Sequence, residues 1–399
     1  MNLNLFTFPK IFFYVYVIKT MGGGLMQLVA YGAQDIYLTG NPQITFFKVV
    51  YRRHTNFSME AIQQTWNGSE TAAGGRCTAT ISRNGDLVHR MYLELDGTTS
   101  TSDNPGSSAI VDVELEIGGQ KIDKQTGAWM EVWAELTEPN PSGYIGVSDG
   151  TNSTGTLFQN MSGMGGAYSN ADATKHFVPL NFWFCRNPGL ALPLIALQYH
   201  EVKVILNHNV VTYYTSTPSN KLWCDYIYLD TDERRRFAQV SHEYLIEQVQ
   251  SQSWSSTSKD LNFNHPVKEL IWHKNFDAGE TIAALGTLTN TWQLKLNGHD
   301  RFAARDTRYF TRVQVWEHHS GCGGLTTDAT AGDGNFVDGI GVYSFALKPE
   351  EHQPSGTCNF SRIDNAQLDS SMGGTFTVYA VNYNVLRIMS GMGGLAYSN

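Results

Sequence analysis

Histidine and cysteine are the residue types in this chain that most often bind metals or act as nucleophiles. The sequence has 12 histidines and five cysteines, and none follows the HxH, HExxH or CxxC spacing that brings two ligands onto one metal ion. His318 and His319 are adjacent, and neighbouring side chains of a strand point to opposite faces. We therefore predict no metal site, and a structural or solvent-exposed role for this histidine pair.

The other candidates for catalysis are equally weak. Asn297-Gly298-His299-Asp300 contains a His–Asp pair, but Asn-Gly is the preferred sequence of a two-residue hairpin turn and no nucleophile accompanies it. No GxxxxGK[ST] phosphate-binding loop is present, and no pair of carboxylates is set apart as acid and base. From the sequence we predict that the protein has no catalytic residue, binds no cofactor and is not an enzyme.

The five cysteines are far apart and odd in number, which indicates neither a disulfide framework nor a zinc site. We expect reduced, mostly buried thiols, as in a protein assembled in the cytosol. The residues concerned are Cys77, Cys185, Cys224, Cys322 and Cys358.

The charge of the chain argues against a surface that binds nucleic acid. The net charge is −9, whereas phosphate binding requires clustered Lys and Arg. The one basic run, Arg234-Arg235-Arg236, follows Asp230, Asp232 and Glu233 and is expected to be a self-neutralised strand end or turn. Charged residues make up only 16% against about 25% in typical domains, which suits a surface covered by neighbouring subunits.

Strands are the elements that must position these residues. The clearest is Val111–Ile117, which is apolar at odd positions, charged at even ones, and followed by the turn sequence Gly118-Gly119. Many such short runs with few helices indicate sandwiches or barrels. The predicted strands are Gln43–Arg53, Leu87–Leu95, Ile110–Ile117, Ala128–Leu136, Phe177–Phe184, Glu201–Leu206, Lys221–Leu229, Glu243–Gln250, Val267–His273, Trp292–Leu296, Thr311–Glu317, Gly341–Leu347 and Thr375–Ile388.

The length of 399 residues and a weak internal repeat predict two domains. Residues 113–119 lead to an aromatic segment around Trp129 and Trp133, and residues 294–298 lead likewise to Phe310–Trp316. We predict an arm or extension at 1–26, a first domain at 27–224 and a second at 225–399. The sequence MSGMGG also occurs twice, at 161–166 and 389–394, and has no physical explanation at this level.

The first 20 residues leave two interpretations open. The apolar run Ile11–Ile18 is too short for a bilayer, which takes about 20 residues, and no A-x-A-like cleavage site follows it. The segment is either an upstream extension before a native start at Met21, or an apolar arm that packs on a neighbour.

From Leu28 onward the chain resembles the major capsid proteins of the nucleocytoplasmic large DNA viruses, the algal and giant virus group. The similarity covers nearly everything after Met21 and spans both halves in the family's order. The motifs that carry it are GAQDIYLTGNPQITFFKVVYRRHTNF at 32–57, PLNFWFCRNPGLALPLIALQYHEV at 179–202, LDTDERRRF at 229–237 and SGTCNFSRID at 355–364.

The resemblance implies an all-β fold of two tandem eight-stranded jelly-roll β-sandwiches, a double jelly roll. It implies a homotrimer with a pseudo-hexagonal outline, because three chains of two similar domains present six near-equivalent units. Such capsomers would form the icosahedral shell of a virion assembled in the host cytoplasm. The implied partners are neighbouring capsomers, minor capsid and penton proteins and a nearby inner membrane, without direct contact to nucleic acid.

Within these motifs, local roles can be assigned as expectations. Gln34–Asn41 would lie at the base of the first domain. Pro188 and Pro193 would bracket a loop that is not regular strand, because proline lacks the ladder donor. Pro354-Ser355-Gly356 would form the matching turn in the second domain. Each segment serves either folding alone or a trimer contact.

Five N-x-[ST] sequences are present, and no secretory signal accompanies them. Asn67 and Asn152 lie in loops rich in Gly, Ser and Thr, so they are the two candidates for a sugar that a virus-specific pathway would add.

Two other functions compete with the shell subunit. Aromatic-rich loops would also suit a jelly-roll protein for glycan binding or host attachment. A jelly-roll enzyme would need a metal or a convergent carboxylate pair.

Overall fold

The computed structural model describes residues 23–98, 104–138, 156–165, 175–274, 290–321, 323, 325–327 and 336–397. The chain divides into two compact units, Met1–Thr55 and Asn56–Asn399. Among the described residues, no helix is long and apolar enough to cross a membrane.

The described part of the first unit contains two short helices, α2 (Gly23–Val29) and α3 (Ile36–Thr39). The predicted strand Gln43–Arg53 is wrong, because these residues form turns and extended chain without a ladder. Its β-prone residues have no other strand to pair with in the described part of this unit, and a strand requires a partner for its backbone groups.

The second unit begins with a jelly roll made of two antiparallel sheets. Its strands are β1 (Phe57–Gln64), β2 (Asn67–Gly68), β3 (Gly75–Thr80), β4 (Leu87–Asp96), β5 (Ile110–Ile117), β6 (Gln120–Thr126), β7 (Lys175–Pro179), β8 (Leu192–Pro193), β9 (Val202–His208) and β10 (Ser219–Leu229). One sheet has the order β1-β10-β4-β7, with β8 added to β4, and the other has the order β2-β3-β9-β5-β6. Alternate side chains such as Leu93 and Leu115 point inward from both sheets into one apolar core.

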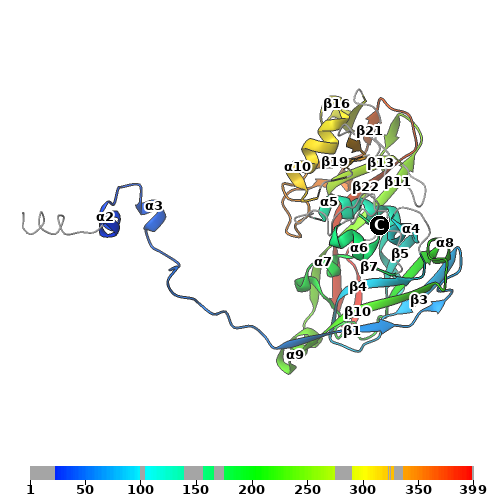
Figure 1. Ribbon diagram of the computed structural model, residues 1–399, viewed down its shortest axis with the longest axis horizontal. Helices are drawn as coiled ribbons and strands as arrows, with labels where there is room; N and C mark the ends of the chain where they lie inside the picture. Colours follow the sequence, from blue (N-terminus) through cyan, green and yellow to red (C-terminus); the bar gives the residue numbers. More distant parts are fainter. Residues whose placement is uncertain are drawn as a thin grey trace, which may run out of the picture. The chain divides into compact units, whose positions relative to one another are not determined.

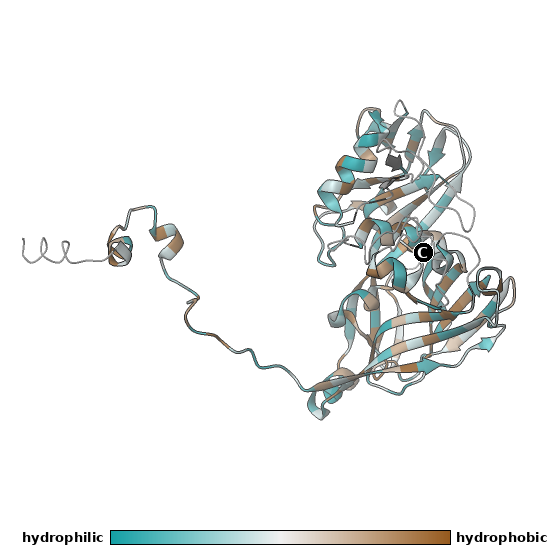
Figure 2. Cartoon of the chain, in the orientation of Figure 1, coloured by the Kyte–Doolittle hydropathy of each residue, from teal (hydrophilic) through white to brown (hydrophobic). Residues whose placement is uncertain are grey.

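A second jelly roll follows with the same arrangement (Figure 1). Its strands are β11 (His242–Trp254), β12 (Ser258–Asp260), β13 (Pro266–Lys274), β14 (Thr291–Leu296), β15 (His299–Asp300), β16 (Arg305–Asp306), β19 (Ile340–Ser344), β20 (Cys358–Asn359), β21 (Ala366–Ser370), β22 (Phe376–Met389) and β23 (Met392–Leu395), with β17 (Leu325–Thr327) and β18 (Phe336–Asp338) forming a separate pair. One sheet has the order β11-β22-β13-β19 and the other β12-β21-β14-β15. A second apolar core containing Trp272, Trp292 and Phe376 lies between them. Figure 2 shows hydrophobic and hydrophilic residues alternating along the strands of both jelly rolls.

Two predicted strands are helices. Ala128–Leu136 lies in α5 (Gly127–Thr137), where the Thr126 side chain accepts a hydrogen bond from the Trp129 amide and caps the first turn. Thr311–Glu317 lies in η2 (Tyr309–Val313) and α10 (Gln314–His318). Both segments are rich in β-branched and aromatic residues, which favour strands by type. In the second segment the buried positions follow the helical period, whereas α5 is buried along almost its whole length between the two jelly rolls.

Shorter helices complete the fold. They are α4 (Pro105–Ser108), α6 (Leu157–Ser162), α7 (Trp183–Arg186), η1 (Pro188–Leu190), α8 (Val210–Tyr213), α9 (Thr231–Gln239) and η3 (Phe360–Arg362). The predicted strand Phe177–Phe184 is therefore right only as far as Pro179, where β7 ends before α7 begins.

The two jelly rolls are connected through the end of β10 and helix α9. The residues on either side of the predicted boundary at 224/225 lie on β10, which pairs with β1 as far as Leu229. The basic run lies in helix α9 and not in a strand end or turn, since Asp230 caps that helix. Arg234 pairs with Asp86 at 2.9 Å, and Arg236 pairs with Glu233 at 3.4 Å.

The predicted hairpin turns are confirmed. Gly118-Gly119 joins β5 to β6, and Asn297-Gly298 joins β14 to β15, in both cases with two consecutive positive φ angles. The repeated MSGMGG has different structures in its two copies. Gly163 ends helix α6 in the left-handed conformation, whereas Ser390-Gly391 forms the turn between β22 and β23.

Candidate functional site

The site that the structure points to is the junction between the two jelly rolls, and its centre is helix α5. This helix follows the hairpin of β5 and β6 in the first jelly roll, while its apolar face contacts the second. Trp129, Val132, Trp133 and Leu136 form one buried cluster with Ile271, Ile340, Val342, Tyr379 and Val381. The ring centre of Trp129 lies 5.3 Å from that of Trp133 and 4.9 Å from that of Tyr379. Burial on this scale stabilises the contact between the sandwiches.

The end of α5 is capped by the second jelly roll. The last carbonyls of a helix have no partner within it. Here the amide of Gly321 donates to the Leu136 carbonyl at 2.8 Å, and that of Gly323 donates to the Glu135 carbonyl at 2.9 Å. A Cβ at position 321 would lie 2.5 Å from the Glu135 oxygen, so glycine is required for this close approach.

A buried ion cluster lies beside α5. Glu247 on β11 contacts Arg186 on α7 at 2.6 Å and Lys268 on β13 at 2.7 Å. The Lys268 side chain is fully buried and that of Glu247 is 5% exposed. Burial alone would raise the pKa of Glu247, but His352, Lys268 and Arg186 outweigh it and hold the pKa at about 2. The carboxylate therefore joins a helix of the first jelly roll to two strands of the second.

Two of these cations also stack on aromatic rings. The Arg186 guanidinium lies 4.4 Å from the ring centre of Trp133, and the Lys268 ammonium lies 5.4 Å from that of Tyr383. Cations over aromatic faces gain energy when they are desolvated. The arrangement links the ion cluster to the apolar cluster on α5.

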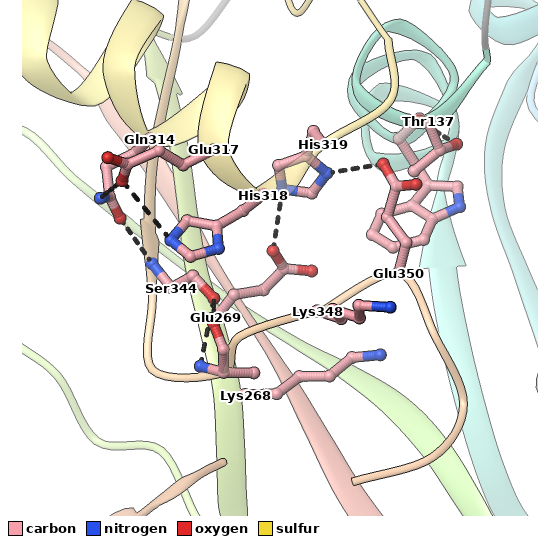
Figure 3. A network of polar contacts seen from close by, with 12 residues as sticks. Thr137, Lys268, Glu269, Gln314, Glu317, His318, His319, Ser344, Lys348 and Glu350 are labelled. Atoms are coloured by element: carbon pink, nitrogen blue, oxygen red, sulfur yellow. Dashed lines mark hydrogen bonds and ion pairs between the residues drawn. The ribbon is translucent and has the colours of Figure 1, made fainter. Parts of the chain in front are cut away.

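A second polar network surrounds His319 (Figure 3). Its side chain is fully buried, with Nε2 3.0 Å from Glu269 and Nδ1 3.1 Å from Glu350. The Ser320 amide donates to Glu350 at 2.8 Å, and the Ser320 hydroxyl lies 2.9 Å from the Thr137 carbonyl oxygen at the end of α5. Burial alone would lower the pKa of His319, but the two carboxylates outweigh it and raise the pKa to about 9. Burial likewise opposes the shift at Glu350, where hydrogen bonds from His319 and Ser320 lower the pKa.

The His319 network predicts a loss of stability at alkaline pH. The folded-state pKa of about 9 lies above the ordinary value of 6.5, so the contribution is fully present below about pH 6.5 and is lost as the pH rises through 9. The expected loss is about 3 kcal/mol. Urea unfolding midpoints at pH 6 and pH 10 would measure it. In His319→Gln the pH dependence over this interval should largely disappear, and an unchanged dependence would contradict the assignment to His319.

The strands of the two sandwiches also contact each other directly. Gln248 on β11 donates to the Ile122 carbonyl on β6, and the Val249 amide donates to Asp123 at 3.3 Å. Burial raises the pKa of Asp123 to about 6, although hydrogen bonds from Gln125, Val249 and Lys124 oppose the rise. Ile246, Leu386 and Ile388 from the second jelly roll reach into the core of the first.

This junction was not predicted from the sequence. His318 and His319, expected on opposite faces of a strand, lie at and just beyond the end of α10, and the buried side chain of His319 lies in the junction. Glu247 and Lys268 lie on predicted strands, but nothing in the sequence distinguishes them from the other polar residues of those strands. Among the described residues no group of three His, Cys, Asp or Glu side chains could hold a metal ion. Cys77, Cys185, Cys224 and Cys358 are free thiols.

None of the predicted glycan and proline positions that the structure describes belongs to the apolar cluster or the ion pairs of the junction. Asn67 is exposed on β2, and Asn152 falls outside the described residues. Pro188 opens η1, Pro193 ends the two-residue strand β8, and Pro354 lies in a loop without regular structure.

Comparison with known families gives two matches that together cover most of the chain. Residues 45–230 match the family described as the major capsid protein N-terminus, and residues 233–394 match the large eukaryotic DNA virus major capsid protein. The first match ends at the N-cap residue of α9 and the second begins in the first turn of that helix.

Individual relatives agree with these matches. The major capsid protein of Pyramimonas orientalis virus is 53% identical, over 95% of this chain and 100% of the relative. That of Paramecium bursaria Chlorella virus 1 is 42% identical over the same shares. Among solved structures, the quasi-atomic PBCV-1 virus capsid matches with a TM-score of 0.73 and 37% identity, covering 89% of this chain and 100% of that chain. The Faustovirus major capsid protein has a TM-score of 0.60 at 15% identity, covers 92% of this chain and 96% of that chain, and shares the fold.

Proposed function

This chain belongs to the major capsid proteins of the large eukaryotic DNA viruses, and we propose that three copies form a pseudo-hexagonal capsomer of an icosahedral shell. The observation that supports this is the matched strand order of the two sandwiches, β1-β10-β4-β7 and β11-β22-β13-β19. Two equivalent units in each of three chains give six similar units around one axis. The outline of such a ring is close to a hexagon, so copies of it can tile a flat facet.

The junction explains how the subunit can serve as a rigid building block. A trimer of double jelly rolls is regular only if the two sandwiches of each chain keep one fixed relation. The apolar cluster on α5, the capped end of that helix and the Glu247 ion cluster all cross between the sandwiches. Packed interfaces of this kind have discrete arrangements and do not deform continuously.

The strand pairing supports a revised division of the chain. We propose a first jelly roll from β1 to the end of β10 at Leu229, a linker formed by α9, and a second jelly roll from β11 onward. The segment before β1 is the arm. The interpretations of residues 1–20 concern residues outside the described part of the chain.

The surroundings of the subunit follow from its place in the shell. We propose that it contacts neighbouring capsomers, minor capsid and penton proteins, lies near an inner membrane and is assembled in the host cytoplasm. A structural role without catalysis is in line with its relatives, which are capsid proteins. The net charge of −9 disfavours direct contact with the genome. Asn67, being exposed, is the described position where a glycan could be attached.

The alternative of a glycan-binding or host-attachment protein is not supported, because the family matches and the relatives are capsid proteins.

The trimer can be tested by the mass of the purified full-length protein. Sedimentation velocity is expected to give a species of three 44.4-kDa chains at micromolar concentration. A folded protein that remains monomeric over the whole concentration range would contradict the proposal.

A further inference from the structure

The two jelly rolls share more than their strand order. In the first, the hairpin of β5 and β6 leads into α5, and in the second the hairpin of β14 and β15 leads, through β16, into η2 and α10. The sheet β1-β10-β4-β7 is therefore the counterpart of β11-β22-β13-β19, and α5 is the counterpart of α10. The surface that α5 contacts therefore indicates the kind of surface that α10 can contact.

Helix α5 covers the outer face of the second jelly roll's sheet. Its cluster partners Ile271, Val342 and Tyr379 lie on β13, β19 and β22. They are paired neighbours in the sheet, since Ile271 lies opposite both Tyr379 and Val342. Because of this contact Trp133 is only 5% exposed.

The equivalent outer face of the first jelly roll is an aromatic patch that no helix equivalent to α5 covers within the described part of the chain. Tyr92 on β4 stacks on Trp223 of β10 at 6.4 Å and meets Phe177 of β7 edge-on at 6.1 Å. Phe177 is 37% exposed and the other two are partly exposed. A cleft of about 730 Å³ adjoins the patch, with Met91, Phe158, Pro179 and Leu180 in its walls and charged residues, among them Arg90 and Asp225, also lining it. The patch and the cleft together form a largely apolar exposed surface of the kind that binds a partner.

Helix α10 has an apolar face that no part of the described chain covers. Phe310 is buried in the core of its own jelly roll and Val315 in the junction cluster beside α5, whereas Trp316 is 83% exposed and Val313, one turn earlier, is 39% exposed. Trp316 has the largest exposed side chain of the second jelly roll. A tryptophan in this position is costly on a free surface and is enriched at the centre of protein interfaces.

We propose that α10 of one copy packs, through Trp316, on the patch formed by Tyr92, Phe177 and Trp223 of the next copy. The occupant is a second copy of this chain, because the chain's own α5 already makes the equivalent helix-on-sheet contact between its two sandwiches. When α10 of each copy makes this contact with the next copy, two kinds of junction alternate around a ring. One lies within a chain and is made by α5, and the other lies between chains and is made by α10. Three chains close that ring by a heterologous contact under threefold rotation. The inference rests on the proposed trimer and adds the residues that hold it together.

The test compares variants of the full-length protein by sedimentation velocity over a dilution series. Trp316→Ala should raise the concentration of half-dissociation at least tenfold. Tyr199→Ala, which removes a 75% exposed aromatic side chain elsewhere, should leave it unchanged. Phe177→Ala should weaken the trimer, and the Trp316/Phe177 double variant should lose less than the two single losses combined, because each removes the same contact. Circular dichroism verifies that each variant is folded.

Two results would overturn the inference. The first is a Trp316→Ala trimer that dissociates at the same concentration as the wild type, and the second is a pair of losses from Trp316→Ala and Phe177→Ala that are independent and additive. In either case the wild-type protein would still form a trimer. The result would therefore contradict the proposed contact and not the proposed function. A monomeric wild-type protein would instead refute both.

Discussion

Glu247→Gln is expected to lower the free energy of unfolding by about 3–5 kcal/mol, the cost of breaking a buried pair. Glu247 is the common partner of Arg186 and Lys268, and the Lys268 side chain has no exposed surface. Glutamine keeps the volume but removes the charge, so two cations lose their counter-ion in a region of low dielectric constant. Urea unfolding at pH 7 would measure the loss.

Glu243→Gln provides the matched control on the same strand. Glu243 pairs with Arg387 at 2.9 Å, but its side chain is 62% exposed, and exposed pairs contribute about 1 kcal/mol or less. If both variants lost the same small amount of stability, the Glu247 cluster would not be a structural element of the junction.

Trp129→Ala is expected to cost about 3–5 kcal/mol and to separate the unfolding of the two sandwiches. Trp129 is fully buried and contacts both Trp133 and Tyr379, so its removal leaves a cavity at the centre of the junction. Once this contact is lost, the cores of the two jelly rolls are coupled less strongly. Differential scanning calorimetry should then show two transitions where the wild type shows one.

Leu294→Ala is the control for this effect. Leu294 is 1% exposed and lies in the core of the second jelly roll, away from the α5 cluster. We expect a loss of stability of about 2–5 kcal/mol, with unfolding still in one transition. A single cooperative transition in Trp129→Ala would show that α5 does not couple the sandwiches.

Local patterns in the sequence were enough to predict much of the fold. Strand β5 was predicted at its observed bounds, because Val113, Leu115 and Ile117 alternate with charged residues. The turns at Gly118-Gly119 and Asn297-Gly298 followed from the need for positive φ angles. The order of the internal repeat also holds, with a hairpin followed by an aromatic segment in both sandwiches.

The errors arose where distant contacts override local preference. Trp129 and Trp133 favour strands by type, but their spacing puts them on one face of a helix that another sandwich covers. The environment of His319 depends on Glu269 and Glu350, which are 50 and 31 residues away in the chain. No short window of sequence contains such pairs, so the junction became visible only in three dimensions.

Electron cryomicroscopy of the purified full-length protein tests the central claim most directly. We predict particles with threefold symmetry in which six β-sandwiches surround the axis and α10 of each chain lies on the β4–β7 face of the next. Particles with one chain, or with a symmetry that leaves the two sandwiches of a chain in unrelated environments, would contradict it.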